Sequence, residues 1–208
     1  MILPMAKLAS KASSSAARGA NRLRIVGGRW RGMRVEFPPV EAIRPTPDRV
    51  RETLFNWLQC KIVDARCLDL FAGSGALGIE ALSRGAAHVT FVDREGAVVR
   101  HLKKTLQNFQ AANAEVIAAD AMAFLSGVPK ACDIVFLDPP FASDVLMKVC
   151  QRLDQGWLSK DAYVYMECSA RSPLPVLPPG WLVYRSKRAG EVGYHLIRVE
   201  GAAAKNFK

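Results

Sequence analysis

A glycine-rich turn between a strand-like run and a helix-like run constrains the fold of this chain more than any other feature. The sequence Asp69-Leu70-Phe71-Ala72-Gly73-Ser74-Gly75-Ala76-Leu77-Gly78 lies at the end of the strand-like run 66–70 and opens a helical pattern that ends near residue 84. Glycines at the first two positions permit backbone conformations and a close ligand approach that a Cβ would prevent, and the third permits close packing of helix on sheet. Backbone amides at the helix N-terminus would face a bound ligand. The turn therefore predicts a nucleotide-binding βα unit.

The segments around this turn alternate between strand-like and helix-like patterns. Strands are expected at 66–70, 88–92, 115–118, 133–137 and 162–167, and helices at 47–60, 76–84, 96–109, 121–126 and 145–153. This alternation indicates an α/β protein with a parallel, doubly wound sheet. Two further strand-like runs, 181–185 and 194–199, are joined by the short link 186–193 without a helix, which predicts a terminal antiparallel hairpin.

Acidic residues follow three consecutive strands of this pattern, namely Asp69, Asp93 and Asp120. A ligand with an ammonium group, a ribose diol and an adenine amine can use three acids, which favours S-adenosylmethionine. The glycine spacing also fits the dinucleotide fingerprint, since Asp93 lies 20 residues beyond Gly73. A nicotinamide-dependent oxidoreductase therefore stays open, although a pyrophosphate has little use for Asp69. Capping of the following helices is the structural alternative for Asp93 and Asp120.

Asp138-Pro139-Pro140-Phe141 ends the apolar run 132–137 and points to methylation of an amino nitrogen. The Asp138 carboxylate and a backbone carbonyl near Pro139 can each accept a hydrogen bond from one N–H of a planar amine. These hydrogen bonds turn the nitrogen lone pair toward a methyl donor. Both prolines stiffen the turn and lack amide hydrogens, and Phe141 offers a face for stacking. An ordinary strand-ending turn is the alternative. The hypothesis makes all four residues catalytic.

Positive charge is concentrated near the start of the chain. The net charge of the chain is +10. Eight of the 29 basic residues lie within residues 1–35, and this segment contains no acidic residue. Such a patch predicts a polyanionic partner, most simply nucleic acid. Residues 21–37 predict a basic β-hairpin whose turn carries Arg29, Trp30 and Arg31, with Trp30 either stacking on RNA or folding back onto the domain. The candidate RNA-binding residues are Arg24, Arg29, Trp30, Arg31, Arg34, Arg44, Arg49, Arg51 and Lys187.

The remaining composition bounds the compartment and the metal chemistry. Five scattered cysteines form no C-x-x-C pair, so we expect reduced thiols, no structural zinc and no other metal site. No apolar run approaches the roughly 20 residues that cross a bilayer. These features favour a cytoplasmic protein. Thr46 is expected to cap the helix that begins at Pro47.

Taken together, the motifs resemble those of the RsmD-type bacterial 16S ribosomal RNA guanine-N2 methyltransferases. The resemblance runs from Arg22 to Val199. It rests on Arg44-Pro45-Thr46 with 48–52 and 54–56, on 69–75, on 138–141 and on 190–196. It implies a Rossmann-like, seven-stranded S-adenosylmethionine-dependent methyltransferase sheet with helices on both faces, plus a small N-terminal hairpin.

The resemblance also implies roles for single residues. The methionine part of the cofactor would be surrounded by Asp69, Phe71, Gly73 and Gly75. Asp93 would bind the ribose, and Asp120 with Ala121 the adenine edge. Asp138 and the Pro139-Pro140 turn would hold a guanine amino group against Phe141.

The implied partner is ribosomal RNA within a partly assembled small subunit, and we expect a monomer. DNA adenine or a protein glutamine is an alternative acceptor, because the same geometry serves any planar amine. The expected organisation is a disordered basic Ala/Ser-rich tail at 1–20, a hairpin extension at 21–43, a methyltransferase domain at 44–200 and a C-terminal tail at 201–208.

Overall fold

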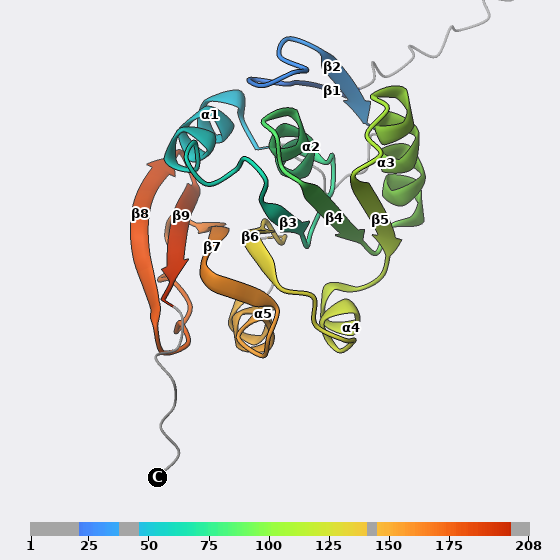
Figure 1. Cartoon of the computed structure of the whole chain (residues 1–208). Coiled ribbons are helices and arrows are strands. Elements are labelled where there is room, and N and C mark those ends of the chain that lie inside the picture. Colours follow the sequence, from blue (N-terminus) through green and yellow to red (C-terminus); the bar gives the residue numbers. More distant parts are fainter. Residues whose placement is uncertain (1–20, 38–45, 141–144, 201–208) are drawn as a thin grey trace, which may run out of the picture.

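A seven-stranded sheet forms the centre of the protein in the computed structural model, which describes residues 21–37, 46–140 and 145–200 (Figure 1). The strand order is β5-β4-β3-β6-β7-β9-β8. The strands are β3 (Arg66–Asp69), β4 (His88–Asp93), β5 (Ala114–Ala118), β6 (Cys132–Leu137), β7 (Leu158–Ser169), β8 (Trp181–Ala189) and β9 (Val192–Val199). Strands β3 to β7 pair in parallel, whereas β9 pairs antiparallel with both β7 and β8. The carboxyl ends of β3 to β7 therefore lie along one edge, the carboxyl edge.

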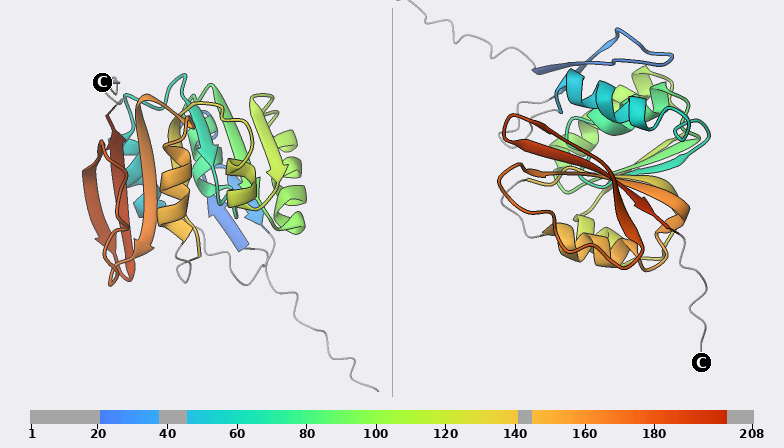
Figure 2. Two further views of the ribbon diagram at one scale, coloured as in Figure 1. Left: turned by 90° about the horizontal axis from the view of Figure 1, so that it is seen from below. Right: turned by 90° about the vertical axis from the view of Figure 1, so that its left-hand side faces the viewer.

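Helices cover both faces of the sheet, as the doubly wound pattern predicted (Figure 2). The helices are α1 (Asp48–Trp57), α2 (Ala76–Ser83), α3 (Gly96–Asn108), α4 (Ala121–Leu125) and α5 (Val145–Leu153). α1, α2 and α3 lie on one face, and α4 and α5 on the other. Because both faces are covered, the central strands are apolar along their length rather than alternating.

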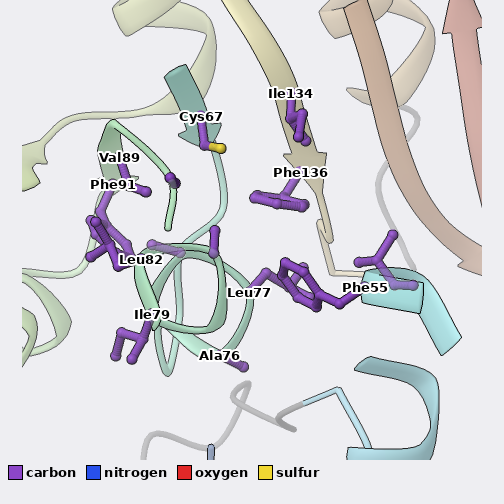
Figure 3. Packing of buried hydrophobic residues seen from close by; sticks show 14 of the residues in the cluster. Phe55, Cys67, Ala76, Leu77, Ile79, Leu82, Val89, Phe91, Ile134 and Phe136 are labelled. Atoms are coloured by element: carbon purple, nitrogen blue, oxygen red, sulfur yellow. The ribbon is translucent and has the colours of Figure 1, made fainter. Parts of the chain in front are cut away.

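The core between the sheet and the first three helices brings distant segments together. Figure 3 shows Phe55 of α1 and Leu77 of α2 near Phe136 of β6. The rings of Phe55 and Phe136 lie 6.0 Å apart between centroids. This packing fixes α1, which precedes the sheet in sequence, beside β6, the strand that Asp138 directly follows.

The predicted N-terminal hairpin is present, with β1 (Asn21–Arg24) paired antiparallel to β2 (Arg34–Phe37). It lies over the outer side of α2 and α3 (Figure 1). The backbone amides of Val26 and Gly27 donate to the carboxylate of Glu80 at 2.8 and 2.7 Å. Gly28 has φ +75°, and a Cβ there would lie 1.9 Å from the carbonyl oxygen of Ser83. The hairpin is thus tightly fixed to α2.

Several predicted boundaries were wrong in the terminal segments. β7 is 12 residues long rather than the six expected, and β8 and β9 extend through most of the predicted link, so that only two residues join them. Thr46 does not cap α1: Pro47 precedes the helix without a side-chain cap, and the Thr46 hydroxyl donates to Glu167 instead. The two expected tails, 1–20 and 201–208, lie outside the described residues, as do Arg44 and Phe141.

Candidate active site

The glycine turn lies at the carboxyl edge between β3 and α2. Gly75 has φ +77° and directly precedes α2, a conformation that favours glycine. A Cβ on Gly78 would lie 2.2 Å from the Phe91 ring, so helix and sheet approach closely here, as the spacing predicted. Phe71 is half-buried in the same turn.

The amides of this turn are not all free for a ligand, which corrects one expectation. The Gly73 amide donates to Asp93 Oδ2 at 2.8 Å, and the Gly78 amide donates to Asp69 Oδ2 at 3.0 Å. The Gly75 amide donates to the Ala72 carbonyl at 2.7 Å. Asp69 and Asp93 therefore stabilise the conformation of the glycine turn through these hydrogen bonds.

The two acids beyond β4 and β5 also make local bonds. Asp93 Oδ1 accepts from the Glu95 amide at 2.8 Å, and Asp120 Oδ1 accepts from the amides of Met122 and Ala123, which caps α4. The capping alternative thus holds for Asp120. Asp93 is half-buried and Asp120 is exposed, so both carboxylates remain accessible at the carboxyl edge. A capping carboxylate keeps acceptor capacity for a ligand, since it has about four lone-pair sites.

These hydrogen-bonding groups fit S-adenosylmethionine better than a dinucleotide. A pyrophosphate would need the amides of the glycine turn, but Gly73 and Gly78 already donate to carboxylates. A cationic cofactor with hydroxyl and amine groups would instead meet Asp93 and Asp120 after β4 and β5, whereas Asp69 at the end of β3 is only 2% exposed. The residues that would hold it are Asp69, Phe71, Gly73, Gly75, Asp93, Asp120 and Ala121.

Asp138 directly follows β6 at the same edge and has an acidic neighbour that sequence reasoning missed. Leu137 of β6 pairs with Met166 of β7, so Asp138, the next residue, lies beside the register position of Glu167 on β7. Glu167 is only 3% exposed. A charged residue inside the apolar run 162–168 was the available signal, because unpaired buried acids are rare.

Two hydroxyl groups donate hydrogen bonds to the buried carboxylate of Glu167. Its Oε1 accepts from the Tyr165 hydroxyl at 2.7 Å and from the Thr46 hydroxyl at 3.0 Å. Tyr165 belongs to the same strand, whereas Thr46 comes from the segment before α1, 121 residues away in sequence. Residues near the start of the domain thus complete the site.

Burial raises the pKa of the three acids Asp138, Glu167 and Asp69. For Asp138, burial raises the pKa well above its ordinary value and the charges of Glu167 and Asp69 add to the effect, although its side chain keeps some exposed surface. Burial likewise raises the pKa of Glu167, partly offset by its two hydroxyl donors. The pKa of Asp69 rises to about 7, mainly through burial, partly offset by the Gly78 amide. A cation bound here would favour ionisation of these carboxyls.

The predicted RNA-binding residues fall into different surroundings. Arg51 was wrongly expected at the surface: it is fully buried and donates to Asp48, Glu80 and the carbonyls of Arg24 and Thr46. Trp30 is 8% exposed and packs on Phe109, so it folds back onto the domain and offers no free stacking face. Exposed positions are occupied by Arg24, Arg29, Arg31, Arg34, Arg49 and Lys187.

Those exposed residues are not gathered in one place. The turn with Arg29 and Arg31 lies against Ser83, at the end of α2 that is remote from the carboxyl edge. Lys187 is in register with Tyr194, which is in turn in register with Glu167, so it lies near the carboxyl edge. Arg49 lies in the first turn of α1, close to Thr46 in sequence.

Two similar solved structures are described as a putative methyltransferase and a putative methylase. The structure is similar to a putative methyltransferase, yhhF, from Escherichia coli, with a TM-score of 0.81, 47% identity and coverage of 87% of this chain and 99% of that chain. It is also similar to a putative methylase, HI0767, from Haemophilus influenzae, with a TM-score of 0.75, 39% identity and coverage of 87% and 100%. The fold and the site define an S-adenosylmethionine-dependent methyltransferase of the Rossmann-like class.

Sequence comparison gives the family. The model of the family described as "Conserved hypothetical protein 95" matches residues 23–198. The chain is 48% identical over 183 residues to the ribosomal RNA small subunit methyltransferase D of Escherichia coli K12, covering 88% of this chain and 92% of that protein. The corresponding protein of Haemophilus influenzae is 41% identical over 181 residues, with coverage of 85% and 93%. The chain therefore belongs to the ribosomal RNA small subunit methyltransferase D family, as the motifs predicted.

None of the helices in the described ranges combines the length and the apolar character that crossing a membrane requires.

Proposed function

We propose that the protein transfers a methyl group from S-adenosylmethionine to the exocyclic N2 of a guanine in small-subunit ribosomal RNA. The observation that carries this proposal is the position of Asp138, which follows β6 at the carboxyl edge beside the candidate cofactor turn. The similarity to ribosomal RNA small subunit methyltransferases supports RNA as the acceptor.

The chemistry assigned to the protein is mainly positioning. The cofactor supplies an electrophilic methyl group on a sulfonium. Asp138 accepts a hydrogen bond from one N–H of the guanine amino group, and a backbone carbonyl near Pro139 accepts a hydrogen bond from the other N–H. The nitrogen lone pair then points away from the ring plane. Pro139 and Pro140 hold this turn rigid. Phe141 completes the proposed acceptor site by stacking on the base.

Exposed basic residues near the carboxyl edge would bind the RNA backbone. The candidates are Arg49, three residues after Thr46, and Lys187, which is linked in register through Tyr194 to Glu167, and each phosphate contact contributes to a salt-dependent affinity. Substitution of either residue by alanine should reduce the slope of log K against log salt by about 1. Arg31→Ala, at the remote hairpin turn, tests whether the RNA extends that far.

We propose that the protein acts as a monomer in the cytoplasm on an assembly intermediate of the small subunit. Comparison of naked ribosomal RNA with purified subunits as substrates, using labelled cofactor, would test the required state of the RNA.

Mass mapping of ribosomal RNA from cells with and without the protein tests the proposed reaction. We expect one methylated guanine to lose its methyl group in cells that lack the protein. Label appearing in DNA or in protein instead of RNA would overturn the choice of acceptor.

The role of Asp138 is tested with purified protein. Asp138→Ala should lower methyl transfer by at least about 100-fold, because positioning contributes several kcal/mol to such reactions, while cofactor affinity changes little. Glu115→Ala, which removes an exposed carboxylate from β5, is the matched control. A fully active Asp138→Ala variant would refute the mechanism.

A further inference from the structure

The buried neighbour of Asp138 has a role that the proposed reaction does not by itself require. Glu167 is 3% exposed, and two hydroxyl groups, from Thr46 and Tyr165, donate to the same carboxylate oxygen. Burial of a carboxylate is costly unless hydrogen bonds compensate it. A structural position in a strand could be filled by an apolar residue at no such cost, so the arrangement points to a function.

Asp138 directly follows β6, and Glu167 holds the neighbouring register position on the parallel strand β7. The Thr46 hydroxyl donates to Glu167 Oε1 at 3.0 Å, and it also lowers the pKa of the Asp138 carboxyl. A hydroxyl group has a single proton, so it can donate fully to only one carboxylate at a time. Two carboxyl groups in neighbouring buried positions do not both ionise readily.

We propose that Glu167 is a positioning residue that controls the charge of Asp138, with the hydroxyl groups of Thr46 and Tyr165 holding Glu167 in place. The inference rests on the proposed role of Asp138 as the group that accepts the substrate N–H bond. Only the anion of Asp138 is a pure acceptor, since the protonated form would present a donor to the amine. The network therefore sets the pH at which the acceptor site becomes competent.

The direction of the effect follows from the groups around Asp138. Among the described residues these are Asp69 on β3 and Glu167 on β7, whose charges raise the Asp138 pKa, and Thr46, whose hydroxyl lowers it. Tyr165 donates to Glu167, and Tyr194 of β9 adds to the raised pKa of the Tyr165 hydroxyl. Removing the Glu167 charge should therefore lower the pKa of Asp138, whereas removing the Thr46 hydroxyl should raise it.

Opposite shifts in two variants provide a sharp test. In the dependence of kcat on pH, activity falls on the acid side as Asp138 becomes protonated. Glu167→Gln should move this acid limb to lower pH by about 1 unit or more, because a neighbouring charge typically shifts a pKa by that amount. Thr46→Val should move it to higher pH, and Thr46→Ser, which restores the hydroxyl, should return it to the wild-type position.

A direct titration separates this inference from the proposed function. Carboxyl carbon NMR of the full chain without cofactor, with the Asp138 signal assigned by Asp138→Asn, reports the titration midpoint whether or not methyl transfer is observed. We expect the midpoint to fall in Glu167→Gln and to rise in Thr46→Val. Unchanged midpoints in both folded variants would overturn the proposal.

Two controls address a purely structural role. Glu115→Gln removes an exposed carboxylate and should leave the Asp138 midpoint unchanged. If Glu167→Gln fails to fold, Tyr165→Phe removes one donor to Glu167 and should still move the midpoint. A loss of rate that is equal at every pH, without a moved limb, would assign these residues to packing alone and refute the inference.

Discussion

Glu80 on α2 should be one of the most sensitive positions for stability, because it joins three parts of the protein. Its fully buried carboxylate accepts from the amides of Val26 and Gly27, from Arg51 Nη1 at 3.3 Å and from Arg84 Nε at 2.8 Å. Glu80→Ala leaves the fully buried Arg51 guanidinium without this ion partner. The two hairpin amides lose their acceptor as well.

The expected loss follows from the burial of both charges. Removing one partner of a buried ion pair costs about 3–5 kcal/mol. Arg51 keeps Asp48 and two backbone carbonyls as partners, which favours the lower end of that range. Since about 1 kcal/mol shifts the melting temperature of a domain of this size by roughly 2–4 °C, a loss of about 3 kcal/mol should lower the midpoint by about 6–12 °C.

Urea and thermal denaturation of the purified variant measure this loss. Glu52→Ala on α1, which removes an exposed helical glutamate, is the matched control and should change stability by less than about 0.5 kcal/mol. A double-mutant cycle with Arg51→Met should give a coupling energy above about 0.5 kcal/mol. A loss below about 1 kcal/mol for Glu80→Ala would refute the assignment of the buried network as the anchor of the hairpin.

Three further perturbations test the core and the acids. Gly78→Ala places a Cβ 2.2 Å from the buried Phe91 ring and should cost about 1–3 kcal/mol in urea denaturation; an unchanged stability would contradict the close packing. Burial raises the pKa of Asp69 from 3.8 to about 7, so the folded state holds its proton more tightly and stability should decline as pH rises through that window. Asp69→Asn should make the decline of stability between pH 5 and 7 shallower. An equally steep decline in this variant would contradict the raised pKa of Asp69. Trp30→Ala should lower stability by about 3–5 kcal/mol, since the ring is buried against Phe109, and a neutral effect in thermal denaturation would favour an exposed role.

Much of the architecture was predictable because it is written in local patterns. The strand before Asp69, the glycine turn and the strand before Asp138 each have a short-range signature, and the structure confirms them as β3, the turn into α2, and β6. The convergence of their ends at one edge also follows, because parallel strands joined by helices place their carboxyl ends together.

The surroundings of charged residues were less predictable. A basic residue has the same local signature whether its guanidinium meets water or a buried carboxylate, so Arg51 was indistinguishable from Arg49 in sequence. The structure buries Arg51 completely and leaves Arg49 exposed. Trp30 posed the same problem, since an aromatic residue at a turn gives no sign of which way its ring points.

The sequence alone determined which elements form and which chemistry is possible, because hydrophobic periodicity, glycine spacing and acids at strand ends act over a few residues. Only the tertiary structure decided which charges are buried and which groups meet around Asp138. The contact between Thr46 and Glu167 spans 121 positions of the chain. Such contacts depend on how all layers pack at once, since a buried polar group is stable only when the completed fold supplies its partner.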